Sequence, residues 1–230
     1  MNYFRKILFL VAALLSVCTG AWCQKRIYTK AHQIQDFRSK TTKVVLTGSP
    51  EFVASLRQEI TTLWTITPYE FCNQAEYDKN KQNSDCYYLH PETIKGIEFL
   101  TLSRGGKEDA SDALKRPVTI VSFPIIGEND KSGRELIYMP AYISLIQDYA
   151  DVAVSSEFSA YSGLRAICTR PPKTLNIITD KDKADEAFLS RYPDSAVQLL
   201  ITPDGDSKGK PRYKLVIGTS DYKLYGYGKY

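Results

Sequence analysis

The side chains best suited to catalysis are scarce in this chain. The 230-residue sequence contains only two histidines, His32 and His90. A hydrolase of the Ser-His-Asp type needs an imidazole as its base and a nucleophile held in a sharp turn. The G-x-S-x-G spacing occurs at Gly205–Gly209, but in the tip of an expected hairpin instead of between a strand and a helix. His90 stands beside Pro91 without a matching partner. We therefore predict no catalytic residue.

Metal-binding and phosphate-binding motifs are also incomplete. A zinc site takes about four nitrogen or sulfur ligands, whereas Cys72, Cys86 and His90 supply at most three. The segment from Gly205 to Lys210 is one residue short of a P-loop and lacks the Ser or Thr that should follow it. We predict no metal ion and no cofactor. Paired carboxylates of the glycosidase type come from distant strands and show no characteristic spacing in a sequence. The sequence therefore neither indicates nor excludes such a pair.

One positional argument still points to a binding site. In open α/β sheets, ligands bind beyond the carboxyl ends of the strands, where the N-termini of helices present free N–H groups. The residues that we predict at this edge follow three expected strands. They are Thr47, Gly48, Ser49, Glu70, Asn73, Thr179 and Asp180. For Ser49 and Asp180 the alternative is a helix cap without a ligand.

The elements that would position this edge begin with a strand, a helix and a second strand between Lys43 and Asn73. Val44–Leu46 reads as a buried strand, and Ser49-Pro50 is a typical helix start. Apolar residues then recur at the spacing of one helix face. They are Phe52, Val53, Leu56, Ile60, Leu63 and Trp64. The segment from Thr65 to Phe71 is predicted to return as a strand, parallel to the first.

The remaining chain continues the alternation of strands and helices. A helix is expected from Asn73 to Lys81, with Asn73 and Glu76 as a capping box, and a long helix is expected from Pro140. Further strands are expected at Cys86–Leu89, Ile97–Leu102, Val118–Ile126, Leu175–Thr179, Val197–Thr202 and Tyr213–Gly218, with Pro124 at an edge or bulge. Asp180 is predicted to cap a helix between two of these strands. That later unit repeats the order of the first, either by duplication or because α/β sheets are commonly built this way.

These elements predict an α/β fold for a single domain spanning residues 43–230. It has a mixed, partly parallel sheet with helices packed on its faces, followed by a C-terminal β-hairpin. The tail after Asp221 alternates tyrosine with glycine and lysine and is expected to add an edge strand. Composition is ordinary for a globular protein, with 43% hydrophobic and 24% charged residues.

Residues 1–23 have the pattern of a secretory signal peptide. Arg5 and Lys6 precede an apolar run from Ile7 to Val17, and small residues follow near Ala21. The run is shorter than the roughly 20 residues that a membrane span needs. We predict cleavage after Ala21 or Cys23, no membrane span in the mature chain, and a location in the periplasm, at the outer membrane or outside the cell. Lipidation of Cys18 is the lesser alternative, because the bulky Val17 precedes it.

The mature chain is expected to begin with a basic arm, residues 24–42, which we interpret as a solvated tether. Loss of Arg5 and Lys6 lowers the formal charge from +4 to +2, which favours neither a nucleic-acid partner nor a membrane partner. Cys72 and Cys86 would form a disulfide if their strands were neighbours. Otherwise both are small buried hydrophobes, as is Cys168.

The leader and the segment Trp64-Thr65-Ile66-Thr67-Pro68-Tyr69-Glu70-Phe71 together resemble uncharacterised exported proteins of the Bacteroides group. The resemblance covers residues 44–89, implies a Gram-negative envelope location and brings no catalytic residue. With 16 tyrosines available for an interface, we expect a non-enzymatic exported domain that binds a partner protein or belongs to an assembly. The alternatives are a carboxylate-dependent hydrolase acting on glycan or peptide and a carrier of a small ligand.

Overall fold

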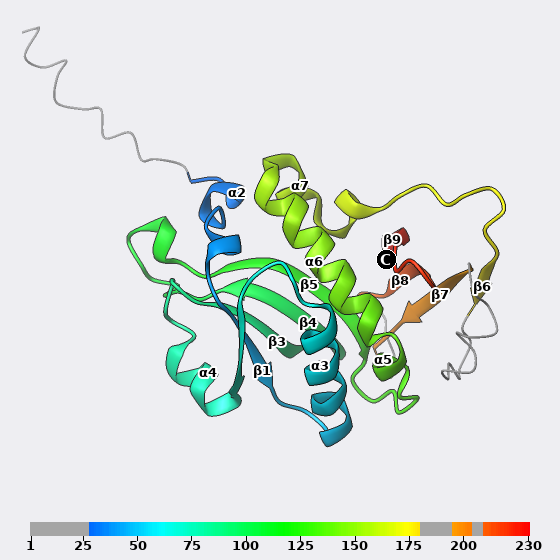
Figure 1. Cartoon of the computed structure of the whole chain (residues 1–230), viewed down its shortest axis with the longest axis horizontal. Helices are drawn as coiled ribbons and strands as arrows, with labels where there is room; N and C mark the ends of the chain where they lie inside the picture. The colour runs from blue at the N-terminus through cyan, green and yellow to red at the C-terminus, as the bar shows by residue number, and fades with distance from the viewer. Residues whose placement is uncertain (1–27, 180–194, 204–208) are drawn as a thin grey trace, which may run out of the picture.

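The described part of the protein forms two β-sheets with helices packed against them. A computed structural model describes residues 28–179, 195–203 and 209–230 (Figure 1). The first sheet has five strands in the order β2-β1-β3-β4-β5, and the second has four strands in the order β6-β7-β8-β9. In Figure 1, α3 and α6 lie side by side across the first sheet, and the second sheet stands beyond the end of α6. The predicted α/β class is confirmed.

The described strands are β1 (Thr42–Leu46), β2 (Tyr69–Asn73), β3 (Tyr87–Ile94), β4 (Ile97–Arg104), β5 (Val118–Gly127), β6 (Ile177–Thr179), β7 (Ala196–Ile201), β8 (Tyr213–Gly218) and β9 (Leu224–Lys229). The described α-helices are α2 (Lys30–Gln33), α3 (Pro50–Leu63), α4 (Gln74–Asn80), α5 (Arg134–Ile137), α6 (Met139–Ser155) and α7 (Glu157–Ser162). Short 3₁₀ helices are η1 (Phe37–Ser39), η2 (Ala113–Lys115) and η3 (Gly163–Ile167).

The first unit, β1–α3–β2, has the predicted parallel pairing. The Ser49 hydroxyl accepts the Phe52 N–H at 3.1 Å and so caps α3. The face of α3 that carries Phe52, Leu56 and Ile60 is buried in the core. Trp64 follows the helix and is only 5% exposed. The strand β2 begins at Tyr69, later than the predicted Thr65.

The capping box of α4 is also confirmed, since the Asn73 side chain accepts the Glu76 N–H and the Glu76 carboxylate accepts the Asn73 N–H. Beyond this helix, however, β3 pairs with β1 and not with β2. Cys72 and Cys86 therefore do not lie on neighbouring strands, and both thiols are free. The disulfide alternative is wrong. Cys72 is buried in a small apolar cluster beneath α4, against which Cys86 packs.

The strands β3, β4 and β5 form an antiparallel meander. The predicted end of β3 at Leu89 is wrong, because the strand continues through Pro91 to Ile94. Pro124 lies in β5 at the edge of the sheet, next to a register shift between Glu98 and Phe99. An edge and a bulge are the positions where a missing N–H is tolerated.

The long predicted helix is α6, which covers the first sheet beside α3. Its residues Ile143, Ile146 and Tyr149 are fully buried. Gln147 connects α6 to the end of α3, because its amide donates to the Leu63 carbonyl at 3.0 Å and accepts the Thr65 N–H at 2.7 Å. These bonds satisfy backbone groups that the end of α3 leaves free.

The described part of the basic arm belongs to the domain. Ile34 and Phe37 are fully buried in the main core, and the Arg104 guanidinium donates to the Gln33 carbonyl. The interpretation of residues 24–42 as a solvated tether is wrong from Tyr28 onward. The cause is the apolar pair Ile34 and Phe37, three residues apart, which covers the Tyr87 side of the sheet.

In the second sheet, β6 and β7 are parallel, and β7, β8 and β9 are antiparallel. The predicted hairpin and the edge strand of the tail are both present. The predicted helix that begins at Asp180 lies outside the described residues. Phe99 of β4 and Tyr213 of β8 join the two sheets in an edge-to-face contact with ring centroids 5.5 Å apart. Among the residues described, no helix has the length and apolar character required to cross a bilayer.

Candidate functional site

A pocket of about 400 Å³ opens at the N-terminus of α3. It lies between that helix, the strands β3 to β5 and the segment that connects β5 to α5. Its walls are Thr47, Gly48, Ser49, Glu51, Phe52, Pro91, Glu98, Ile126, Glu128, Asp130, Lys131, Gly133, Glu135 and Leu136. Apolar side chains thus form part of the wall and carboxylates dominate the polar part.

The first strand and its turn build one side of the pocket. After β1 the chain turns at Gly48, whose φ of +116° is disfavoured for residues with a side chain. A Cβ at this position would stand 3.3 Å from the Phe52 ring, so the turn also packs closely on α3. Ser49 then uses its hydroxyl to cap the helix. These residues shape the pocket chiefly through the backbone.

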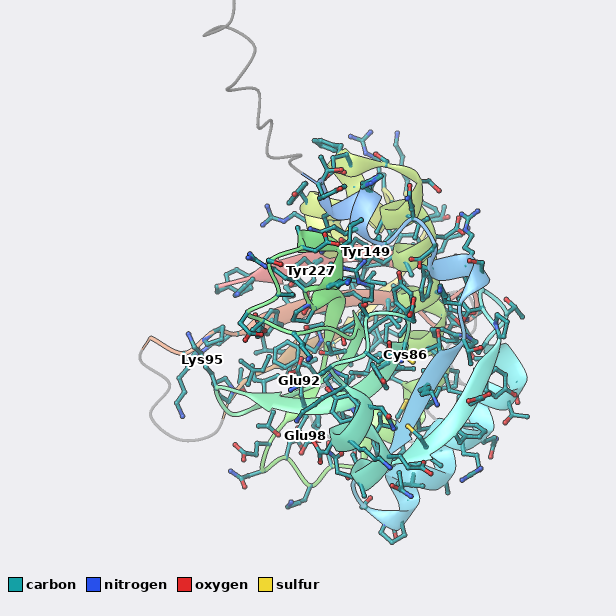
Figure 2. The ribbon with its side chains drawn as sticks, turned by 90° about the vertical axis from the view of Figure 1, so that its left-hand side faces the viewer. Cys86, Glu92, Lys95, Glu98, Tyr149 and Tyr227 are labelled. Atoms are coloured by element: carbon teal, nitrogen blue, oxygen red, sulfur yellow. The ribbon has the colours of Figure 1, made fainter. Side chains whose placement is uncertain are left out.

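The acidic side chains come from distant elements. Glu51 lies in the first turn of α3, Glu98 in β4 (Figure 2), Glu128 just after β5, and Glu135 in α5. Asp130 differs from them, because Arg134 pairs with it at 2.9 Å. Among the described residues, no ion pair neutralises the other four carboxylates. The pocket therefore carries an excess of negative charge.

Burial, and to a smaller extent the neighbouring charges, raises the pKa of two carboxyl groups. Burial raises the pKa of Glu98, and the neighbouring charge of Glu135 raises it further. Burial also raises the pKa of Glu135, with a smaller contribution from Asp130. The Oε2 atom of Glu135 is buried and lacks a hydrogen-bond partner within the described structure. Lys131 opposes these shifts only in part, so a further positive charge in the pocket would stabilise the ionised form of both groups.

The predicted site residues are only partly brought together. Thr47, Gly48 and Ser49 line the pocket, whereas Glu70 on the edge strand faces Lys43, with their charged atoms 3.5 Å apart. The Asn73 side chain is occupied in capping α4. Thr179 ends β6 in the second sheet, paired in register with Gln198, and Asp180 lies outside the described residues. The ligand-binding role of the three pocket residues stays a prediction.

His90 has the surroundings of a packed core residue. Its ring stacks on Tyr77 with centroids 5.0 Å apart, and burial lowers its pKa. Its Nε2 lies 3.5 Å from the Ser103 hydroxyl, which is at the limit of a hydrogen bond. The nearby N–H groups of Gly105 and Gly106 already donate to backbone carbonyls. They cannot serve a Ser103 nucleophile as an oxyanion hole.

Sequence reasoning missed the carboxylates that dominate the pocket. No sequence pattern around Glu128 or Glu135 indicates a pocket. They line it because the segment after β5 folds back over this end of the sheet. Glu98 did carry a local signal, as a lone charged residue inside the apolar run of β4. Glu51 carries only the general signal of an acidic residue in the first turn of a helix, where the helix dipole favours negative charge.

The part of the chain that the structure describes contains no group of three or more His, Cys, Asp or Glu side chains placed to hold a metal ion. In comparisons with known proteins, no family model matches the chain, and no curated protein or solved structure is significantly similar to it. The function must therefore be inferred from the pocket itself.

Proposed function

We propose that this protein is a non-enzymatic exported domain that binds a partner protein, and that the acidic pocket receives a basic side chain of that partner. The leader sequence supports export. The binding proposal rests on four carboxylates around one pocket of about 400 Å³, none of which forms an ion pair among the described residues: Glu51, Glu98, Glu128 and Glu135. Lys131 on the same wall offsets their charge only in part.

The pocket suits a lysine or arginine side chain in both charge and shape. Phe52, Pro91, Ile126 and Leu136 supply apolar surface for an aliphatic stem. The carboxylates at Glu98 and Glu135 supply acceptors for an ammonium or guanidinium group. A bound cation would also relieve the repulsion that raises the pKa of Glu98. Binding should therefore release protons and weaken as the pH falls.

The test is calorimetric titration with a short peptide that contains one arginine, and with the same peptide carrying citrulline, which has nearly the same shape and no charge. We expect the arginine peptide to bind, and the double variant E98Q/E135Q to bind it about tenfold or more weakly. We also expect weaker binding at pH 5 than at pH 7, because protonation removes the negative charge.

Glu70→Gln is the matched control. Glu70 is an exposed carboxylate of the same unit, paired with Lys43 and outside the pocket wall. Its variant should bind like the wild type. Equal binding of the arginine and citrulline peptides, or equal losses in E70Q and E98Q/E135Q, would show that the pocket does not recognise a cation.

A carboxylate-dependent hydrolase is the second candidate. The specific observation in its favour is that two carboxyls with raised pKa values, Glu98 and Glu135, line one pocket. A carboxyl that keeps its proton near neutral pH can act as a general acid. Hydrolysis of glycan or peptide substrates that is abolished in both E98Q and E135Q, but not in E70Q, would establish this reading over the binding one.

A further inference from the structure

The segment between β5 and α5 supplies much of the wall of the acidic pocket. The wall residues that come from this segment and from α5 are Glu128, Asp130, Lys131, Gly133, Glu135 and Leu136. A segment outside the strands has few ladder hydrogen bonds to hold it, so its position must be fixed by other contacts. The contacts that fix this segment therefore determine the shape of the pocket.

Arg134 binds the segment to the second sheet. Its Nη2 atom pairs with the Asp130 carboxylate at 2.9 Å and donates to the Leu200 carbonyl of β7 at 3.0 Å. In Figure 1, α5 lies beside β7. The Arg134 side chain is only 11% exposed, so solvent weakens this pair less than an exposed one. The Asp130 carboxylate also accepts the Ser132 N–H at 2.9 Å, which folds the segment on itself.

Backbone contacts hold the start of the same segment. A Cβ on Gly127, the last residue of β5, would stand 2.4 Å from the Thr202 carbonyl oxygen, so the chain after β7 packs directly on this position. The Glu128 N–H donates to the Gly96 carbonyl at 3.0 Å. Glu128 is therefore placed by the backbone, and Arg134 is the side chain that fastens the rest of the segment to β7.

We propose that Arg134 is the positioning residue of the acidic pocket, and that the second sheet, through the Leu200 carbonyl, sets the geometry in which the pocket receives a cation. This inference rests on the proposed function of the pocket. Arg134 is not a wall residue, so it acts on a bound cation only through the segment that it holds. The second sheet thus takes part in recognition, although none of the wall residues comes from its described strands.

Position and charge predict opposite effects of removing Arg134. Burial raises the pKa of Glu135, and the positive charges of Arg134 and Lys131 both oppose that shift. The loss of either charge makes the pocket more negative, which by itself should tighten the binding of a cation. Lys131 is exposed and forms no ion pair among the described residues. Lys131→Met therefore changes only the charge, whereas Arg134→Met also releases the segment.

The test measures two quantities in the full chain. One is the affinity for the arginine peptide by calorimetry, and the other is amide hydrogen exchange of residues 128–137 by mass spectrometry. For R134M we expect binding about fivefold or more weaker and faster exchange in this segment. For K131M, the matched control that removes the same charge, we expect equal or tighter binding and unchanged exchange.

Arg134→Lys keeps the charge on a side chain that is one bond shorter. We expect it to recover part of the affinity and part of the protection from exchange together, and it gives the same comparison if R134M does not fold. Recovery of the affinity without the protection would assign the effect to charge and overturn the proposal.

Binding of R134M as tight as that of K131M would also overturn the proposal. So would unchanged exchange in R134M, because the segment would then not depend on Arg134. Failure of the wild-type protein to bind the arginine peptide would instead refute the proposed function. The exchange comparison would in that case still decide whether Arg134 holds the pocket wall.

Discussion

The units β1–α3–β2 and β6–β7 look alike in sequence and differ in their place in the fold. Each contains two parallel strands. In the first unit the leading strand, β1, is an inner strand between β2 and β3. In the later unit the leading strand, β6, is the edge strand, with Ile177 47% exposed, and the second strand, β7, is internal and largely buried.

This reversal shows that strand order along the chain does not determine which strand becomes central. A strand is internal when both of its edges find partners, and β1 and β7 each have a second neighbour, β3 and β8. The reversed positions do not fit an internal duplication. The different burial of the two units also predicts different effects of mutation on stability. Substitutions of core residues in the first unit should lower the free energy of unfolding strongly, and substitutions in β6 only slightly.

The largest expected effect is that of Leu56→Ala in α3. Leu56 is fully buried, so truncation removes apolar contacts and leaves a cavity, at a cost of about 2–5 kcal/mol in the free energy of unfolding. The matched change Ile177→Ala in β6 should cost less than about 1 kcal/mol, because nearly half of that side chain is already exposed. Urea unfolding measures both. Equal losses would remove the contrast between the two units.

The next effect concerns the polar network at the end of α3. Trp64 Nε1 donates to the Thr67 hydroxyl at 2.9 Å, and that hydroxyl lies 2.8 Å from the Thr42 hydroxyl. Thr67→Val keeps the shape but leaves buried polar atoms without a partner, at a cost of about 1–3 kcal/mol. Thr67→Ser should retain most of the stability. Wild-type Trp64 should also emit as a shielded indole, and free access of an aqueous quencher in the folded protein would contradict the buried position.

A smaller effect is expected from Ser49→Ala. Loss of the hydroxyl that accepts the Phe52 N–H should cost about 1 kcal/mol of unfolding free energy. Ser49→Asp should restore it, because aspartate caps a helix equally well. The arginine-peptide assay separates the two roles of Ser49. Loss of binding at unchanged stability would identify it as a ligand contact as well as a cap.

The smallest expected effect is that of Glu135→Gln in the acidic pocket, and it should depend on pH. The pKa of Glu135 is raised by burial, so its contribution to stability is fully present below the ordinary glutamate pKa and is lost as the pH rises through the raised value. Glu135→Gln should therefore stabilise the protein at pH 7, by no more than about 1 kcal/mol because the group is partly solvated, and leave stability at pH 3.5 unchanged.

Asp221, in the turn between β8 and β9, has a pKa shift of the opposite sign. Burial opposes its ionisation, but hydrogen bonds from the Tyr225 hydroxyl and the Lys223 N–H outweigh it and lower its pKa. Its stabilising contribution is present at neutral pH and is lost as the pH falls through the lowered value. Asp221→Asn should thus destabilise at pH 7. Thermal unfolding at several pH values tests both signs, and a stabilising D221N would show that burial dominates there too.

Local patterns predicted the first half of the fold well. The Ser49 cap, the apolar face of α3, the capping box of α4 and the length of α6 depend on residues within one or two turns of each other. The continuation of β3 through Pro91 was missed because the local proline signal was overridden by pairing with β4. The burial of the arm was missed because Ile34 and Phe37 are explained only by the sheet that they cover.

The sequence by itself determined the main helices and most of the strands, how α3 and α4 begin, and that the chain forms an α/β domain, because caps and periodicity act between near neighbours. Only the tertiary structure decided that β1 separates Cys72 from Cys86, that β6 lies at an edge, and that Glu98 and Glu135 share a pocket. Strand pairing and the convergence of carboxylates join residues far apart in the chain. The energies of these contacts depend on distances between residues in the folded protein, which the spacing of residues along the chain does not reveal.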